Sequence, residues 1–149
     1  MIQEATYSTI LYLDVLEHVS DDRGQLSAAA ALLSSARYLI VLVPAHQFLY
    51  SAFDQAIGHY RRYSPTSLAG LEPPHCRLVL MRSLDSVGLL ASLANAFLLR
   101  QSPPTSGQIH SWDRLLVPLS RYVDPVLGYR VGKSILAIWQ RGEDTDETI

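Results

Sequence analysis

A short polar segment directly after an apolar run carries residue types that could do acid–base chemistry. Asp14, Glu17 and His18 follow the apolar residues Ile10–Leu13. A carboxylate or an imidazole can orient an acceptor group or remove its proton, and two carboxylates with an imidazole are also reasonable ligands for a divalent cation. In the structural alternative, Glu17 and His18 only cap or buttress the following helix. We predict catalytic roles for all three residues and name no residue as a metal ligand.

A second polar group follows another apolar run. Val41–Val43 ends at Pro44, and the connection Ala45–Ser64 is rich in aromatic and basic residues. Paired arginines bind carboxylate or phosphate in a bidentate manner, and neighbouring tyrosines stack or donate hydrogen bonds. In the structural alternative, one arginine pairs with Asp54 or Asp21 and the tyrosines pack against the sheet. The predicted acceptor-binding residues are His46, Tyr50, His59, Tyr60, Arg61, Arg62 and Tyr63.

Both polar groups need strands that end beneath them. Thr9–Leu13 predicts a strand, and Asp21 or Asp22 begins an Ala/Leu-rich helix, with Gln25 completing a capping box after Asp22. Tyr38–Val43 is apolar on both faces, which predicts a central strand in a parallel sheet. Because ligands bind beyond the carboxyl ends of such strands, we expect both groups to border one crevice.

The remaining pattern extends this α/β arrangement to nearly the whole chain. We expect one domain over residues 1–141 and a disordered acidic tail over 142–149. Pro118 should kink or divide the helix that contains it. The further predicted elements are a turn at Ser34–Arg37, a short helix from Ser64-Pro65 to Gly70, a strand at Arg77–Ser83, helices at Leu84–Arg100 and Trp112–Val123, and a last strand at Lys133–Trp139.

Composition and charge limit the classes of protein to which this chain can belong. A chain of 149 residues is long enough for one domain with a real core. Its formal net charge of -2 gives no reason to propose a nucleic-acid partner. The single Cys76 excludes an internal disulfide, and no signal-peptide pattern is found, which favours a cytoplasmic protein. No apolar run reaches the roughly 18 residues of a membrane span, although the stripe Leu84–Leu99 leaves peripheral membrane contact open beside plain core.

Four stretches, taken in order, resemble one known family. They are Leu13–Val19, Val41–His46, Gly58–Ser64 and Gly132–Ile138. The first, Leu-Asp-Val-Leu-Glu-His-Val, resembles the fourth-strand motif of class I S-adenosylmethionine-dependent methyltransferases, and the match continues through the others. The resemblance covers nearly the whole chain, but only the carboxyl-terminal part of the family's domain, starting at the fourth strand.

The resemblance implies a fold, an activity and a methyl donor. The implied fold is α/β, a Rossmann-like three-layer methyltransferase sandwich truncated at its amino terminus. The implied activity is methyl transfer from S-adenosylmethionine to a small-molecule acceptor, with acidic and lipid-linked acceptors both open. Asp14 and Val15 would lie against the donor, and Asp14 and His18 would align the acceptor or take its proton. The spacing Asp-x-x-Glu-His is also similar to Glu-x-x-Glu-His in quinone-pathway O-methyltransferases, where it implies a divalent cation.

The family's main donor-binding motifs are not found in this sequence. In the family, a Gly-rich loop and an acidic ribose-binding residue precede the fourth strand, whereas Gly24 is the only glycine here before Gly58. By resemblance, the family's first strand pairs with the fourth, so its absence would leave Ile10–Val15 as an exposed apolar edge. We therefore expect self-association or a partner chain, and an isolated chain that is inactive alone.

Three origins are compatible with that pattern: a start codon placed too far downstream, a broken gene, or a half-domain that a partner chain completes. The alternative to an enzyme is a non-catalytic interaction module. Such a module would bind a partner through its open sheet edge or its apolar helices, without binding the methyl donor.

Overall fold

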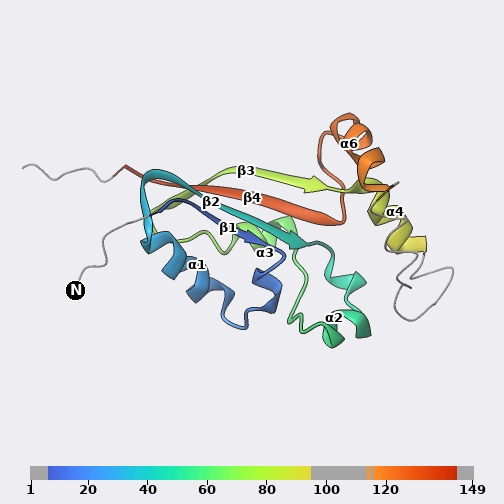
Figure 1. The fold of residues 1–149 in the computed structure, drawn as a ribbon, viewed down its shortest axis with the longest axis horizontal. Helices are drawn as coiled ribbons and strands as arrows, with labels where there is room; N and C mark the ends of the chain where they lie inside the picture. Colours follow the sequence, from blue (N-terminus) through green and yellow to red (C-terminus); the bar gives the residue numbers. More distant parts are fainter. Residues whose placement is uncertain (1–6, 95–113, 115, 144–149) are drawn as a thin grey trace, which may run out of the picture.

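A mixed sheet of four strands organises the computed structural model, which describes residues 7–94, 114 and 116–143 (Figure 1). The strand order is β1-β2-β4-β3, with β1 and β2 parallel and β4 antiparallel to both of its neighbours. All four predicted strands are confirmed, although the strand predicted at Tyr38–Val43 is twice as long as predicted and the last strand begins one residue later than predicted. The strands are β1 (Tyr7–Leu13), β2 (Leu33–Pro44), β3 (Cys76–Leu84) and β4 (Ser134–Arg141).

The central place predicted for Tyr38–Val43 is confirmed, but the sheet around it is mixed, whereas a parallel sheet was predicted. β2 pairs in parallel with β1 on one side and antiparallel with β4 on the other. The registers place Leu13 opposite Leu42, and Ser134 opposite both Pro44 and Leu84. The carboxyl ends of β1, β2 and β3 therefore meet at one edge of the sheet, which we call the strand-end edge.

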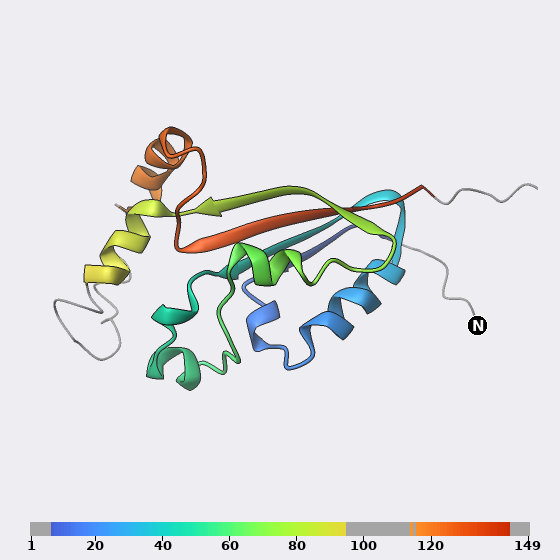
Figure 2. The ribbon, with the colours of Figure 1, turned by 180° about the vertical axis from the view of Figure 1, so that it is seen from behind.

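The helices α1 (Asp22–Ala31) and α3 (Pro65–Ala69) cover one face of the sheet (Figures 1 and 2). Leu39, Val41 and Val43 alternate along β2 toward these helices and are fully buried. Burying each such side chain contributes about 1.5–3 kcal/mol relative to leaving it in water. The same core holds Leu33 at the start of β2 and residues of α1, α3 and β4, namely Leu26, Ala29, Leu68, Ile135, Ala137 and Trp139.

The opposite face of the sheet carries a row of apolar side chains that crosses all four strands. Leu11 pairs with Ile40, Ile40 with Ile138, and Ile138 with Leu80 across the four strands. Leu11 is 56% exposed. In the described part of the chain, β1 pairs only with β2. The described residues form a sheet layer and a helix layer along most of the sheet, so the third layer and the truncation at the amino terminus both stay predictions.

The remaining helices and 3-10 turns are short. On the helix-covered side they are η1 (Leu16–His18), α1 (Asp22–Ala31), η2 (Gln47–Leu49), α2 (Ala52–Ala56) and α3 (Pro65–Ala69). Beyond the carboxyl end of β3 lie α4 (Ser86–Ala94) and α6 (Val117–Val126). The helix predicted from Ser64-Pro65 is confirmed, with Ser64 as its N-cap. No described helix has both the length and the apolar content that a membrane crossing requires.

Several local predictions need correction. The Asp21 carboxylate caps α1 by accepting from the Gly24 N–H at 2.9 Å, whereas Gln25 donates to the Tyr12 hydroxyl, so the predicted Asp22–Gln25 capping box does not form. Ser34–Arg37 lies within β2, where Ala36 adopts a φ of 59°. Pro118 lies in the first turn of α6, where its missing N–H costs least, and most of the predicted helix before Val117 lies outside the described residues, so the predicted kink or division stays a prediction.

Some predicted segments lie partly outside the described residues. The predicted helix Leu84–Arg100 is described only as far as Ala94, and Trp112 and most of the predicted tail 142–149 are not covered. The domain boundary at residue 141 therefore stays a prediction.

Candidate functional site

Asp14 is the first residue beyond β1 at the strand-end edge. Its N–H donates to the Leu42 carbonyl at 3.0 Å, and its φ of 52° lies in the left-handed region. Non-glycine residues rarely adopt this conformation, although Asp tolerates it better than most. Both Asp14 and Val15 are exposed. The sharp turn at Asp14 lets the chain enter η1 with Glu17 facing inward.

Glu17 is a buried carboxyl group, with 1% of its surface exposed. Its Oε1 atom lies 3.7 Å from Nε2 of His59, and its Oε2 atom has no hydrogen-bond partner among the described residues. Burial raises the pKa of Glu17 above its usual 4.5, and the nearby Asp14 charge adds to the rise, while its own backbone and the two histidines oppose it. A buried carboxyl group with an oxygen that lacks a hydrogen-bond partner lowers the stability of the folded protein, and such groups concentrate at functional sites.

His59 is held in place by Asp54. Its Nδ1 atom lies 2.9 Å from Oδ1 of Asp54, which is completely buried at the start of α2. The Asp54 carboxylate also accepts hydrogen bonds from the Ser51 N–H and hydroxyl and from the Arg62 guanidinium. Burial alone would raise the pKa of Asp54, but the hydrogen bonds from Arg62 and His59 outweigh it and lower the pKa. Asp54 is therefore an ionised anchor for the imidazole.

His18 completes this group at the protein surface. Its ring meets the His59 ring edge-on, with centroids 4.6 Å apart. Glu17, His18 and His59 each offer one ligand-type atom, and these atoms lie within 4.8 Å of one another. His18 is exposed, so the group opens to solvent through it. We call Glu17, His18, His59 and Asp54 the Glu17 cluster.

The connection Ala45–Ser64 is called the acceptor loop after its predicted role, and its two arginines pair with carboxylates of this chain. Arg61 binds Asp22 at 2.6 Å and the Ser20 carbonyl at 2.7 Å, and Arg62 binds Asp54 at 2.9 Å. This arrangement matches the structural alternative, in which an arginine pairs with Asp54. The role of Arg61 and Arg62 in binding an acidic acceptor stays a prediction, and Asp22 is a partner that the sequence did not single out for Arg61.

Tyr63 lies in the core, contrary to the predicted contact with an acceptor. It is 2% exposed, and its hydroxyl donates to Asp22 at 3.0 Å. Burial, reinforced by the Asp22 charge, raises the pKa of Tyr63 far above its usual value. Tyr63 instead ties the acceptor loop to α1, which positions the neighbouring residues.

The other predicted loop residues occupy three different environments. The His46 ring contacts the Gly132 carbonyl through Nε2 at 2.9 Å, on the side of the loop that faces β4. Tyr50 donates to the His59 carbonyl at 2.6 Å and so holds the backbone of the Glu17 cluster. Tyr60 is 58% exposed, while its N–H donates to the Glu17 carbonyl. Among these three, Tyr60 offers the most accessible side chain near the cluster.

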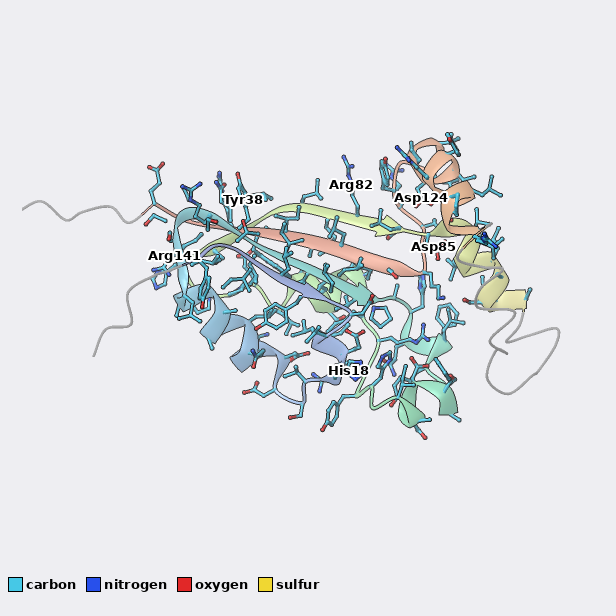
Figure 3. The ribbon with its side chains drawn as sticks, in the orientation of Figure 1. His18, Tyr38, Arg82, Asp85, Asp124 and Arg141 are labelled. Carbon is cyan, nitrogen blue, oxygen red and sulfur yellow. The ribbon has the colours of Figure 1, made fainter. Side chains whose placement is uncertain are left out.

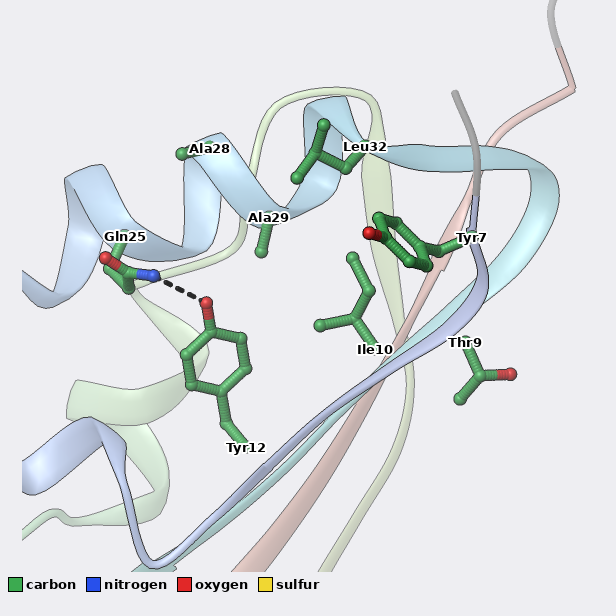
Figure 4. A pocket seen from close by; sticks show the side chains of 8 residues that line it. All are labelled: Tyr7, Thr9, Ile10, Tyr12, Gln25, Ala28, Ala29 and Leu32. Carbon is green, nitrogen blue, oxygen red and sulfur yellow. Dashed lines mark hydrogen bonds between the residues drawn. The ribbon is translucent and has the colours of Figure 1, made fainter. Parts of the chain in front are cut away.

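A pocket of about 340 Å³ lies elsewhere, between β1 and α1 (Figure 4). Its walls are mostly apolar, and the hydrogen bond from Gln25 to Tyr12 crosses one end at 2.7 Å. The pocket lies along β1, the edge strand of the described sheet, and contains none of the predicted site residues. Its lining residues are Tyr7, Thr9, Ile10, Tyr12, Gln25, Ala28, Ala29 and Leu32.

A second buried polar group lies at the strand-end edge, between α4 and α6. Asp124 accepts from the N–H groups of Asp85 and Ser86 at 2.8 and 2.9 Å, and from the Ser86 hydroxyl. Ser120 donates to Asp85 at 2.7 Å, and Asp85 accepts from the Gly88 N–H. These four residues, Asp85, Ser86, Ser120 and Asp124, are the capping cluster. Figure 3 shows Asp85 and Asp124 beside α4 and α6, apart from His18.

Neither Asp54 nor the capping cluster has a site role that the sequence predicts. The capping box Ser51–Asp54 is a readable signal for a helix start. The pairing of Asp54 with His59 depends on the turn at Gly58, whose φ is 85°, and no residue spacing encodes that pairing directly. Asp85-Ser86 after a strand is a similar start signal, whereas its partner Asp124 is distant in sequence.

Solved structures of known proteins resemble this fold. The chain matches one in the complex between the Haloferax volcanii Trm112 methyltransferase activator and a protein assigned as a methyltransferase, with a TM-score of 0.50 and 10% identity, over 93% of this chain and 55% of the other. It matches a SAM-dependent methyltransferase from Archaeoglobus fulgidus with a TM-score of 0.50 and 14% identity, over 92% of this chain and 60% of the other. The fold is methyltransferase-like.

These likenesses concern the fold alone, because sequence identity is low. The chain spans 55% and 60% of the lengths of the two structures. No protein-family model matches the sequence, and no curated protein matches it significantly.

Proposed function

We propose that this chain forms the acceptor side of an S-adenosylmethionine-dependent methyltransferase that acts on a small molecule. The observation that carries the proposal is the position of the Glu17 cluster, with Asp14, beyond the carboxyl ends of the parallel strands β1 and β2. Ligands of open α/β sheets bind at that place. Because the fold is methyltransferase-like, methyl transfer is the reaction that we propose for this position.

The proposed reaction needs alignment and a proton acceptor. An acceptor oxygen attacks the methyl carbon of the donor sulfonium, the carbon–sulfur bond breaks, and S-adenosylhomocysteine leaves. The proton of the acceptor hydroxyl passes to a base. His18 is the exposed imidazole at the cluster and Asp14 the exposed carboxylate, so we assign the base to His18 and alignment of donor and acceptor to Asp14. In this proposal Val15 borders the donor, while Glu17 supports both imidazoles from below.

The nature of the acceptor is constrained by the loop around the cluster. Because Arg61 and Arg62 pair with Asp22 and Asp54, an acidic acceptor would have to compete with internal carboxylates. Tyr60 and His18 present exposed rings instead. We therefore favour an acceptor with a hydroxyl on an aromatic or apolar body, for which these rings supply a stacking surface.

The proposal also includes a donor-binding part beyond β1. The Gly-rich loop expected from the family resemblance is not in these residues, and the described part of β1 has a free edge. We propose that strands pairing with this edge complete the donor site, supplied either by preceding sequence or by a second chain. One structural neighbour comes from a complex with a methyltransferase activator, which supports considering a partner chain.

The test compares donor binding by two forms of the protein. One is the 149-residue chain, and the other is extended upstream by whatever reading frame precedes the Met1 codon. Calorimetric titration with S-adenosylhomocysteine should show binding only to the extended form. In that form, Asp14→Asn should lower kcat for methyl transfer at least about tenfold, in line with the usual contribution of a positioned acid–base group. An extended form that fails to bind the product would overturn the proposal.

A different function class is favoured by one observation. Tyr7, Leu11 and Leu13 of β1, the edge strand of the described sheet, are 53%, 56% and 51% exposed. An interaction module would use this edge to add a partner strand without binding the donor. Light scattering of the 149-residue chain, with and without the extension, separates the two cases. An interaction module would associate in both forms, whereas a completed methyltransferase would be monomeric once extended.

A further inference from the structure

In the Glu17 cluster, two hydrogen-bond acceptor atoms face each other without a donor between them. An ionised carboxylate can only accept hydrogen bonds, so the contact between Asp54 and Nδ1 of His59 requires the proton on Nδ1. In the neutral imidazole, the lone pair is then on Nε2. That atom lies 3.7 Å from the Glu17 carboxylate, which is also an acceptor. A cation between them would resolve this arrangement.

We propose that Glu17, His18 and His59 bind one divalent transition-metal ion of the zinc class. The three residues offer a carboxylate oxygen and two imidazole nitrogens within 4.8 Å of one another. Zinc binds such atoms at about 2.0–2.2 Å, so ligand atoms at these separations can share one ion after small side-chain movements. The proposal concerns binding alone, and it holds whether or not the chain transfers methyl groups.

The burial of Glu17 is the second, independent observation. Its side chain is 1% exposed, yet Oε2 has no partner among the described residues. Buried polar atoms without partners are rare in folded proteins and call for an ion, a water or a functional reason. A metal ion coordinated by Oε2 would supply the missing partner and offset the free-energy cost of the buried negative charge.

Asp54 supplies the support that metal-binding histidines usually have. A ligating imidazole commonly donates its other N–H to a carboxylate, which fixes the ring and its tautomer. His59 has this arrangement, and Asp54 is itself fixed by Ser51 and Arg62. His18 is exposed, so it can adjust toward the ion from the solvent side.

The ligand types indicate which ions would bind. Two imidazoles and one carboxylate suit zinc, cobalt, nickel or iron, whereas magnesium and calcium prefer sites made of oxygen atoms. Three protein ligands leave a position for water or a substrate oxygen. The set differs from the Asp-x-x-Glu-His pattern, because His59 of the acceptor loop belongs to it and the exposed Asp14 does not.

The competing explanation is a proton in place of a metal. A protonated His59 would bridge Asp54 and Glu17 as an ion pair. The 3.7 Å contact to Glu17 is too long for a hydrogen bond, and it would leave Oε2 of Glu17 and the His18 ring without a part in the cluster. The two explanations differ in one measurable property, which is saturable binding of a metal ion.

The test titrates the full 149-residue chain, freed of metal with EDTA, with Co²⁺. We expect one Co²⁺ per chain with visible absorption bands, displacement by Zn²⁺, and no displacement by excess Mg²⁺. Glu17→Gln and His59→Gln should each weaken binding more than about 100-fold, beyond the effect typical of a supporting partner, and Asp54→Asn about 10–100-fold. X-ray absorption of the Zn²⁺-loaded wild-type chain should show two imidazole ligands, a readout that needs no variant.

The matched control is His75→Asn. His75 is exposed, lies outside the cluster and has a φ of 60°, which Asn tolerates. This variant should bind Co²⁺ like the wild type. The proposal is overturned if the wild-type chain shows no saturable binding, if His59→Gln binds as tightly as His75→Asn, or if Zn²⁺ is surrounded by oxygen ligands alone.

Discussion

The Glu17 cluster and the capping cluster are two buried polar groups at the same edge of one sheet, yet they differ in how their atoms are satisfied. In the capping cluster, Asp124 accepts three hydrogen bonds from Asp85 and Ser86, and the Ser120 hydroxyl donates a hydrogen bond to Asp85. In the Glu17 cluster, one oxygen of Glu17 has no partner among the described residues, and Nε2 of His59 faces the other oxygen without a hydrogen bond.

This difference separates a structural role from a functional one. A buried group with all partners in place stabilises the fold, whereas one left unpaired costs about 1–3 kcal/mol. The capping cluster joins α4 to α6 and satisfies N–H groups at the start of α4. The Glu17 cluster keeps a buried carboxylate oxygen that has no hydrogen-bond partner among the described residues, which is typical of a site prepared for a ligand. Substitutions in the two clusters should therefore change stability in opposite directions.

The largest effect is expected at Gly132, which lies between the acceptor loop and the residue that precedes the capping cluster. Its carbonyl contacts His46 of the acceptor loop, and a Cβ atom there would lie 2.2 Å from the backbone oxygen of Leu84, just before the capping cluster. Because backbone cannot yield as a side chain can, Gly132→Ala should lower the free energy of unfolding by about 3 kcal/mol. Urea unfolding followed by circular dichroism measures the change.

Gly70→Ala is the matched control for that substitution. At Gly70 the nearest backbone oxygen lies 3.4 Å from the added Cβ, and φ is an ordinary -65°. Its unfolding free energy should stay within about 0.5 kcal/mol of wild type, or rise slightly through the smaller entropy of the unfolded chain. Equal losses for Gly70→Ala and Gly132→Ala would contradict the close contact between Gly132 and Leu84.

An intermediate effect is expected inside the capping cluster. Asp124→Asn replaces one acceptor oxygen by an amide that turns donors toward the N–H of Asp85 or Ser86. We expect a loss of about 2 kcal/mol in the free energy of unfolding. Asp14→Asn makes the same chemical change at an exposed residue and should shift stability by less than about 0.5 kcal/mol. If both variants unfold at the same urea concentration, Asp124 is not the support that the geometry indicates.

Much of the scaffold could be predicted from the sequence, because the strands are local patterns. The apolar runs at Thr9–Leu13 and Tyr38–Val43 each became a strand, and Ser64-Pro65 began a helix. The antiparallel insertion of β4 between β2 and β3 was not visible, since an apolar strand looks alike in either direction. The pattern also could not show that the described residues leave one face of the sheet without helices.

The site was predicted in its location more than in its roles. Asp14, Glu17 and His18 lie at the strand-end edge as expected, but the sequence could not show that Glu17 turns inward while Asp14 stays exposed. That outcome depends on the left-handed turn at Asp14. Likewise, Tyr63 resembled a loop residue and proved to be core, because its neighbours in space come from α1. Roles that depend on contacts distant in sequence leave no local pattern.

The smallest effect, and the one of opposite sign, is expected at Glu17. Glu17→Gln removes a buried charge while keeping the shape of the side chain, so without metal it should raise the free energy of unfolding by about 1 kcal/mol. Glu143→Gln, at an exposed position, should have almost no effect. Both are measured by urea unfolding in the presence of EDTA.

Adding Zn²⁺ should then reverse the order of stability at Glu17. Wild-type chain gains stability because the ion binds the folded state, whereas Glu17→Gln has lost a ligand and gains little. Glu143→Gln should follow the wild type under both conditions, because Glu143 is not one of the residues that form the cluster. A Glu17→Gln variant that is less stable than wild type in EDTA would show that the Glu17 carboxylate is fully compensated within the fold. The two clusters would then be alike, and the contrast between a structural and a functional group at this edge would be lost.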